Sequence, residues 1–134
     1  MGEWKAIRGQ EDCENLLDLF GGFQDGCVRE LHAWTGHYVD QEFSMACDPT
    51  FNLRMLVQRQ WRDPSAIELV FGEVESIKWF PAKPDSDDTI LNAWLFVTEG
   101  VLVWSLAPPE EFEEWTHVAS RKLWVERSER VDGS

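Results

Sequence analysis

The spacing of apolar residues changes once along this chain, shortly after residue 20, from a helical period to a strand period. Before that point, Cys13, Leu16, Leu17 and Phe20 recur at intervals of three and four residues, which places them on one face of a helix. Acidic residues fill the predicted first turn, where the helix dipole favours carboxylates. The following glycine pair supplies a left-handed stop. The sequence therefore predicts one helix within the run QEDCENLLDLFGG.

Beyond the glycine pair, apolar and polar residues alternate, which is the pattern of half-buried strands. Residues 51–61 alternate most clearly, and Pro64 marks a turn before the next strand at 66–74. Residues 74–80 continue as a further strand, or as the same strand after a bulge at Gly72. The other predicted strands are residues 4–7, the two arms of a hairpin around Gly36 (27–34 and 37–43), the two arms of a hairpin around Gly100 (89–97 and 101–107), and a last strand over 116–128.

These elements predict an α+β fold, an antiparallel sheet of about six to eight strands with one N-terminal helix packed on one face. The short connections favour antiparallel pairing, because parallel strands need long crossovers. We expect one face of the sheet to bury the helix and most of the tryptophans. Residues 1–134 are expected to form a single domain, with a loop at 81–89 and a frayed tail at 128–134.

Charge is the strongest deviation of the composition, with 12 basic residues against 25 acidic ones and a net charge of −13. The excess is largest in residues 68–117, which hold 11 acidic residues and two lysines. Such a chain repels nucleic acid and anionic membranes and attracts a basic protein partner. The competing interpretation is that the acidity serves solubility alone. The sequence leaves the oligomeric state open.

The start of the chain and its cysteines carry two further predictions. The first ten residues lack the basic region and apolar core of a signal peptide, so we expect a cytoplasmic protein. The three cysteines, Cys13, Cys27 and Cys47, form no CxxC pair. We expect them to be free and mostly buried.

The candidate partner-binding residues lie in the acidic part of the chain, where an aromatic pair is surrounded by carboxylates. They are Glu110, Glu111, Phe112, Glu113, Glu114 and Trp115. An aromatic side chain can anchor a protein interface, and the acidic residues around it steer a basic partner towards it. The function predicted from this pattern is a non-enzymatic protein-interaction domain that binds a basic partner.

The alternative prediction is a small-ligand-binding, metal-binding or enzymatic site around the predicted hairpin at Gly36. Asp25, His32 and His37 carry the side chains that such a site would need. The histidines do not form an HxH or HExxH pattern, and no serine nucleophile elbow or phosphate-binding loop is present in the sequence. We therefore predict no catalytic residues, no metal and no cofactor.

Several segments together resemble a family of small uncharacterised bacterial proteins. They are GGFQDGCVRELHAWTGHYV, SMACDP, LRMLVQRQW, AIELVFGEVESIKWF, VLVWSLA and VASRKLWVERS. In that family a Phe-His-Asp-like element precedes the first strand, and here it reads Phe23-Gln24-Asp25. The family is similar in size, acidity and general pattern to immunity-protein-like families of bacterial polymorphic toxin systems. The resemblance implies an immunity-type protein that occludes a basic toxin, and the glutamine argues against histidine chemistry at that element.

Overall fold

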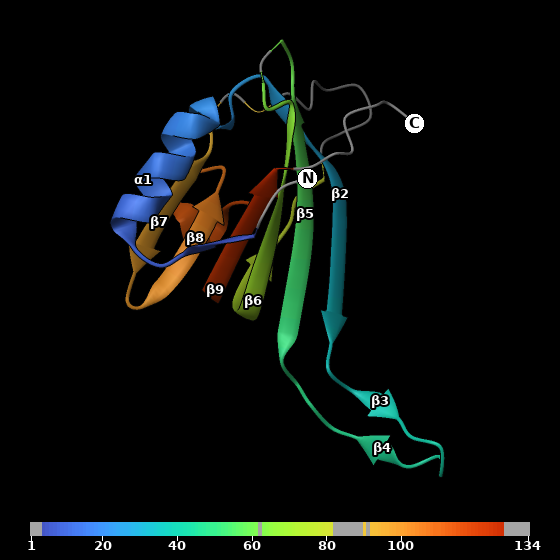
Figure 1. Cartoon of the computed structure of the whole chain (residues 1–134). Coiled ribbons are helices and arrows are strands. Elements are labelled where there is room, and N and C mark those ends of the chain that lie inside the picture. Colours follow the sequence, from blue (N-terminus) through green and yellow to red (C-terminus); the bar gives the residue numbers. More distant parts are fainter. Residues whose placement is uncertain (1–3, 62, 82–89, 91, 128–134) are drawn as a thin grey trace.

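In the part of the chain that the structure describes, a seven-stranded antiparallel sheet carries the fold, and one α-helix covers one of its faces (Figure 1). The computed structural model describes residues 4–61, 63–81, 90 and 92–127. The strands are β1 (Lys5–Ile7), β2 (Gly26–Thr35), β3 (Tyr38–Val39), β4 (Met45–Ala46), β5 (Phe51–Arg59), β6 (Ala66–Lys78), β7 (Trp94–Thr98), β8 (Val101–Ser105) and β9 (His117–Arg127). The helices are α1 (Gln10–Leu19) and the short 3-10 turns η1 (Gly21–Phe23) and η2 (Phe112–Glu114). The predicted α+β class is confirmed.

The order of strands in the sheet is β2-β5-β6-β9-β8-β7. Strand β9 pairs with β6 along its whole length. Its opposite edge is shared by two shorter strands, because β8 pairs with residues 117–120 and β1 with residues 123–125. A separate two-stranded ribbon, β3 with β4, extends from the end of the β2–β5 pair (Figure 1).

Helix α1 forms as its apolar spacing predicts, and it ends at the glycine pair. Cys13, Leu16 and Phe20 are buried against the sheet, and Leu17 is half-buried. Gly21 and Gly22 have φ values of 61° and 66°, a left-handed conformation that glycine adopts without strain. This reversal places Phe23 beside Phe20, with ring centroids 5.2 Å apart.

The hydrophobic core lies between α1 and the sheet. Strands β5 and β6 contribute their alternating residues to this face, as do the inward residues of β7, β8 and β9. The fully buried large side chains of this core include Leu53, Met55, Phe71, Leu95 and Trp104. A smaller cluster of Phe96, Val103 and Ala119 lies on the other face of the sheet. The helix thus covers one face only.

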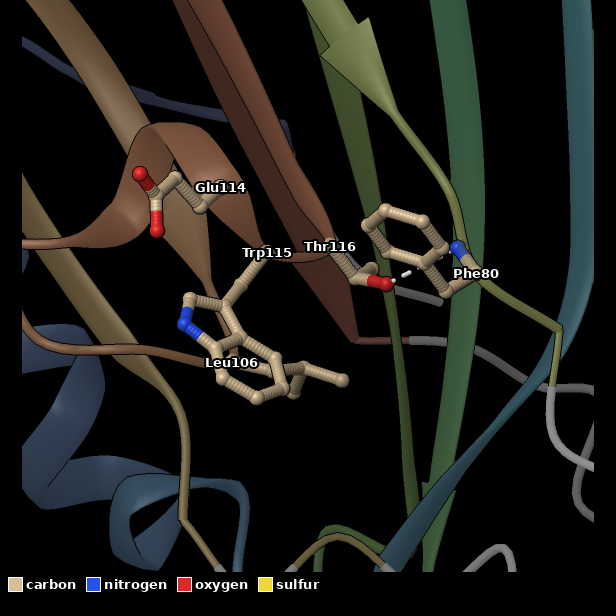
Figure 2. A pocket seen from close by; sticks show the side chains of 5 residues that line it. All are labelled: Phe80, Leu106, Glu114, Trp115 and Thr116. Carbon is tan, nitrogen blue, oxygen red and sulfur yellow. Dashed lines mark hydrogen bonds between the residues drawn. The ribbon is translucent and has the colours of Figure 1, made fainter.

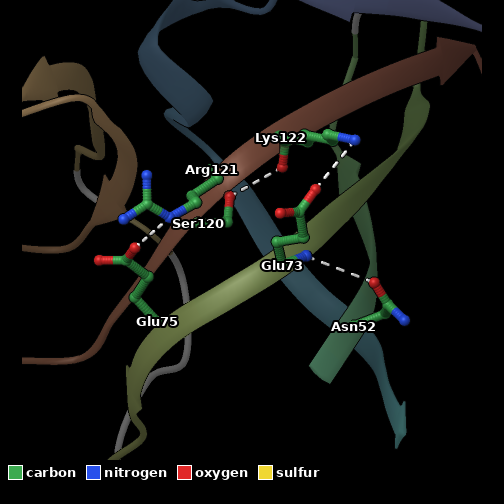
Figure 3. A network of polar contacts seen from close by, with 6 residues as sticks. All are labelled: Asn52, Glu73, Glu75, Ser120, Arg121 and Lys122. Carbon is green, nitrogen blue, oxygen red and sulfur yellow. Dashed lines mark hydrogen bonds and ion pairs between the residues drawn. The ribbon is translucent and has the colours of Figure 1, made fainter. Parts of the chain in front are cut away.

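Strand β6 is continuous from residue 66 to residue 78, so the second of the two interpretations of this segment is correct. Its irregularity lies beyond Gly72: Glu73 has a φ of 52°, and the register with β9 shifts between Val74 and Ser76. Figure 3 shows the ion pairs that bridge this irregular stretch, Glu73 with Lys122 and Glu75 with Arg121. Gly72 has a different role, because a β-carbon there would lie 2.9 Å from the ring of Trp124.

The hairpin predicted around Gly36 is wrong. Strand β2 pairs with β5, from Gly26 opposite Arg59 to Thr35 opposite Phe51. Residues 37–43 instead enter the β3–β4 ribbon, where Tyr38 lies opposite Ala46. The physical reason is that β5 offers a long strand with an apolar face, whereas residues 37–43 are mostly polar and cannot cover β2.

The predicted burial of tryptophan and cysteine is wrong in part. Trp104 is fully buried on the helix face, but Trp94 packs in the cluster on the opposite face. The exposed tryptophans are Trp4, Trp34, Trp61 and Trp115. The cysteines are free, yet only Cys13 is buried, and Cys27 and Cys47 are exposed. Alternation along the chain showed which residues share a face, but it did not reveal which face is covered.

The predicted loop at 81–89 falls almost wholly outside the described residues, and the predicted tail at 128–134 falls wholly outside them. The hairpin around Gly100 is confirmed for β7 and β8, with Glu99 and Gly100 at φ values of 49° and 82°. Within the described part of the chain, no helix has the length and apolarity needed to cross a membrane.

Replacing Leu16 by alanine is expected to lower the free energy of unfolding by about 2–5 kcal/mol, because a buried leucine is lost and a cavity remains. Leu17→Ala should cost less, since Leu17 is only half-buried. The matched control is Leu19→Ala on the exposed side of α1, which should change stability by about 0.5 kcal/mol or less. Urea unfolding followed by tryptophan fluorescence measures all three. Equal values for Leu16→Ala and Leu19→Ala would show that α1 is not docked as described.

The stability of the fold is expected to decline at alkaline pH through Cys13. Burial, with the nearby Asp12 and Glu14 carboxylates, raises the pKa of this thiol from 9.0 to about 11. Between these two values the unfolded chain releases the proton and the folded chain keeps it, so stability falls as the pH rises from 9.0 to about 11. Unfolding measured across this range should show a steeper decline for the wild type than for Cys13→Ala. Parallel pH profiles of the two proteins would contradict the assignment.

Candidate functional site

Three apolar side chains from separate segments meet in one surface hollow at an end of the sheet. Phe80 follows β6, Leu106 follows β8, and Trp115 precedes β9. Together with Glu114 and Thr116 they line a hollow of about 430 Å³, here called the apolar hollow. Phe80 and Trp115 are 57% and 52% exposed, so both rings remain available for contact. Figure 2 shows the two rings on opposite sides of the hollow, with the Glu114 carboxylate directed away from them.

Thr116 ties the three segments of the apolar hollow together. Its hydroxyl oxygen accepts a hydrogen bond from the backbone N–H of Phe80 at 3.0 Å (Figure 2). Its carbonyl accepts another from the N–H of Leu106 at 3.1 Å. Thr116 is itself buried, so these bonds are shielded from water. The hydrogen bonds therefore fix the backbone positions from which the side chains of the hollow extend.

Of the residues predicted as the partner-binding surface, Glu114 and Trp115 line this hollow, and the other four precede them in the chain. Glu110, Glu111, Glu113 and Glu114 are all exposed. The backbone holds them in two tight turns, in which the N–H of Glu111 bonds the Pro108 carbonyl and the N–H of Trp115 bonds the Phe112 carbonyl, each at 3.0 Å. Within the ranges that the structure describes, none of the four carboxylates forms an ion pair with a basic side chain. Their charge is directed to solvent.

Phe112 lies beneath the acidic segment and not on its surface. The ring is half-buried, with its centroid 5.4 Å from that of Phe96 and 5.1 Å from that of His117. His117 is buried, and its Nδ1 bonds the Trp115 carbonyl at 2.9 Å. Because a carbonyl can only accept, Nδ1 carries the hydrogen, and Nε2 can then accept from the Ser76 hydroxyl at 3.2 Å. Phe112 and His117 thus support the backbone from which Trp115 extends.

The structure does not bring together the residues of the alternative ligand site. Asp25 lies before the start of β2 and His32 lies within it, so the rise of an extended strand separates them by about 23 Å. His32 stacks on Trp34, with centroids 5.5 Å apart. His37 lies beyond the end of β2, where its Nδ1 accepts a hydrogen bond from the Asp48 N–H at 3.0 Å. Among the described residues, no group of three His, Cys, Asp or Glu side chains is placed to hold a metal ion.

Sequence reasoning identified Trp115 and Glu114 but missed Phe80, Leu106 and Thr116. Phe80 stands 35 positions before Trp115 in the sequence. Only the pairing of β6 and β8 with β9 brings these positions together. The one signal in the sequence was Phe80 itself. It is a large apolar residue directly before Pro81, at the end of a predicted strand, where no predicted neighbouring strand covers it.

Titration of the purified protein with Zn²⁺ is expected to show no stoichiometric binding, because Asp25, His32 and His37 are too far apart to share an ion. A chelator should leave the melting temperature unchanged, as scanning calorimetry would measure. A stabilisation by Zn²⁺ that disappears in His32→Ala would contradict this and restore the ligand-site hypothesis.

The chain was compared with models of known protein families, with curated proteins and with solved structures, and no match was found in any of the three. The resemblance to immunity-protein-like families therefore stays a prediction from the sequence.

Proposed function

We propose that this protein is a non-enzymatic interaction domain that binds a basic protein partner at the apolar hollow. The observation that carries the proposal is the meeting of Phe80, Leu106 and Trp115 in a hollow that Glu114 also lines, with three more exposed glutamates at positions 110, 111 and 113 of the same segment. In this proposal an apolar side chain of the partner enters the hollow and supplies most of the affinity. The partner's lysine and arginine residues face the glutamates.

The nature of the hollow favours a protein over a small charged ligand. Each of its three apolar side chains is more than a third exposed, so the hollow is open and wide and does not enclose a molecule. A phosphate or carboxylate ligand would be repelled by Glu110, Glu111, Glu113 and Glu114. A basic protein surface is attracted by the same charges, and it can cover the exposed rings without being enclosed.

The finer proposal is that the partner is a basic toxin and that this chain is its immunity protein. The resemblance of the sequence to immunity-protein-like families supports it, as does the net charge of −13. A strongly acidic surface raises the rate at which a cationic enzyme is captured. The chain would then act by covering the toxin and would need no chemistry of its own.

The test uses affinity capture from a lysate of the source organism, followed by binding kinetics with the purified captured protein. Trp115→Ala should speed dissociation at least about 30-fold, since a hot-spot tryptophan contributes about 2 kcal/mol or more. Glu111→Lys with Glu114→Lys should mainly slow association. Association with the wild type should slow steeply as salt rises, because exposed charges are screened beyond about 8 Å at physiological ionic strength.

Matched controls separate the hollow from general effects. Trp61→Ala removes a tryptophan that is 87% exposed, in the turn between β5 and β6, and it should leave the kinetics unchanged. Glu11→Lys with Glu14→Lys makes the same charge change at the same spacing on exposed positions of α1. If both charge-reversed pairs slow association equally, the negative charge acts through the whole chain and not at the hollow. Binding kinetics that neither Trp115→Ala nor the salt concentration changes would contradict the proposal.

A further inference from the structure

The β3–β4 ribbon joins the main sheet through two short segments (Figure 1). The β2–β5 ladder ends at Thr35 and Phe51, and the ribbon begins at Tyr38. Residues 36–37 and 47–50, which lie between the ladder and the ribbon, are here called the hinge. Among the described residues, no strand ladder includes the hinge, so its other contacts decide the direction in which the ribbon leaves the sheet.

The two segments of the hinge meet at His37 and Asp48. The backbone N–H of Asp48 donates a hydrogen bond to Nδ1 of His37 at 3.0 Å. Because a backbone N–H can only donate, Nδ1 carries no hydrogen, and the imidazole in this structure is neutral. The Asp48 carboxylate lies against Gly36, where a β-carbon would collide with it. A neutral imidazole is therefore part of what holds the hinge together.

We propose that His37 is a pH-sensitive switch, whose neutral imidazole sets one direction of the ribbon and whose protonation changes that direction. When the ring takes a second proton, Nδ1 becomes a donor and can no longer accept from the Asp48 N–H. The charged ring is then attracted to the Asp48 carboxylate, which can accept from it. The hinge thus has two alternative hydrogen-bond arrangements. Histidine changes its charge between about pH 5 and pH 8, so acidification over this range converts one arrangement into the other.

The Asp48 carboxylate is the charged group that acts on the ring. Hydrogen bonds from the side chain and the backbone N–H of Thr50, with the nearby His37, hold the pKa of Asp48 below its usual value. The carboxylate is therefore charged throughout the range in which a histidine titrates. His37 and Asp48 are both exposed, so water supplies the proton directly.

No basic side chain close in the sequence opposes a positive charge on the imidazole. Residues 36–50 contain neither lysine nor arginine. Their other titratable side chains are Tyr38, Asp40, Glu42 and Cys47. The two residues of the sheet that border the hinge, Thr35 and Phe51, are uncharged. The next histidine along the chain, His32, lies within β2 and outside the hinge, so it serves as the control.

The switch does not rest on the proposed function, because Phe80, Leu106 and Trp115 of the apolar hollow lie outside the hinge and the ribbon. Failure of one proposal therefore leaves the other standing. The effect of the switch is largest at the tip of the ribbon, where Phe43 is 89% exposed. The tip is about 17 Å from the hinge, at the rise of an extended strand over residues 38–42, so a swing of about 20° moves it by about 6 Å. Two spin labels can measure a displacement of that size.

The test places one nitroxide label at the tip of the ribbon, on Glu42→Cys, and one at an exposed position of α1, on Asn15→Cys, in the full chain. The exposed Cys27 and Cys47 are replaced by serine, and the buried Cys13 is kept. Double electron–electron resonance measures the distance between the two labels at about pH 8 and about pH 5.5. The distribution of distances should shift or broaden by about 6 Å or more on acidification, because the hydrogen bond across the hinge is lost.

Two variants of His37 separate the hydrogen bond from other effects of pH. His37→Asn places an amide oxygen where Nδ1 lies, and that oxygen accepts at every pH, so the distribution should stay as it is in the labelled parent chain at about pH 8. His37→Ala offers no acceptor, so its distribution should differ from that of the parent at about pH 8 and should not change with pH. His32→Asn should respond to pH as the parent does. Circular dichroism confirms that each variant is folded.

A second measurement follows the hinge itself. In proton–nitrogen correlation spectra of the unlabelled chain, the Asp48 amide resonance should move along the same titration curve as the ring resonances of His37. It should not move over this range in His37→Asn. A distance distribution that is the same at both pH values, or one that still changes in His37→Asn, would overturn the proposal. An Asp48 amide that does not respond to the protonation of His37 would overturn it as well.

Discussion

The contact between α1 and the sheet through a row of aromatic rings holds the rest of the structure in place. Phe20 contacts Phe23, Phe23 contacts Trp104 at 6.0 Å, and Trp104 stacks on Trp79 at 6.2 Å, all measured between ring centroids. At the start of the row, the guanidinium of Arg59 lies 4.2 Å from the centre of the Phe20 ring and donates to the Pro64 carbonyl. Rings packed edge-to-face and stacked in this way favour one geometry over others. The row therefore fixes how the helix, the turn between β5 and β6, strand β8 and the end of β6 meet.

The same row positions the apolar hollow. Trp79 is partly buried and packs against the core, the next residue, Phe80, is exposed, and Trp104 stands two positions before Leu106. Once the two tryptophans are fixed, the chain has little freedom in where it places Phe80 and Leu106. Thr116 completes the arrangement through its two hydrogen bonds. The apolar hollow is thus supported from beneath by packed aromatic rings, as a preformed surface requires.

The charge of the chain and the apolar hollow have related effects. A net charge of −13 opposes association between copies and with most acidic proteins of the cell. Contacts can then form only where apolar surface or local charge outweighs that repulsion. The apolar hollow offers Phe80 and Trp115 beside Glu114.

The sequence by itself determined the class of the fold and most of its elements. The spacing of Cys13, Leu16 and Phe20 specified the buried side of α1, and alternation specified β5, β6 and β9, because both periods follow from local backbone geometry. It also singled out Trp115 and its glutamates as a surface. Only the tertiary structure decided that β2 pairs with β5 and not with residues 37–43, which leaves the β3–β4 ribbon outside the main sheet. Only the tertiary structure brought Phe80 and Leu106 to Trp115 and kept Asp25, His32 and His37 apart. Distant segments compete to pair with a given strand, and the pairing that buries more apolar surface prevails. The local sequence pattern does not show which segment that is.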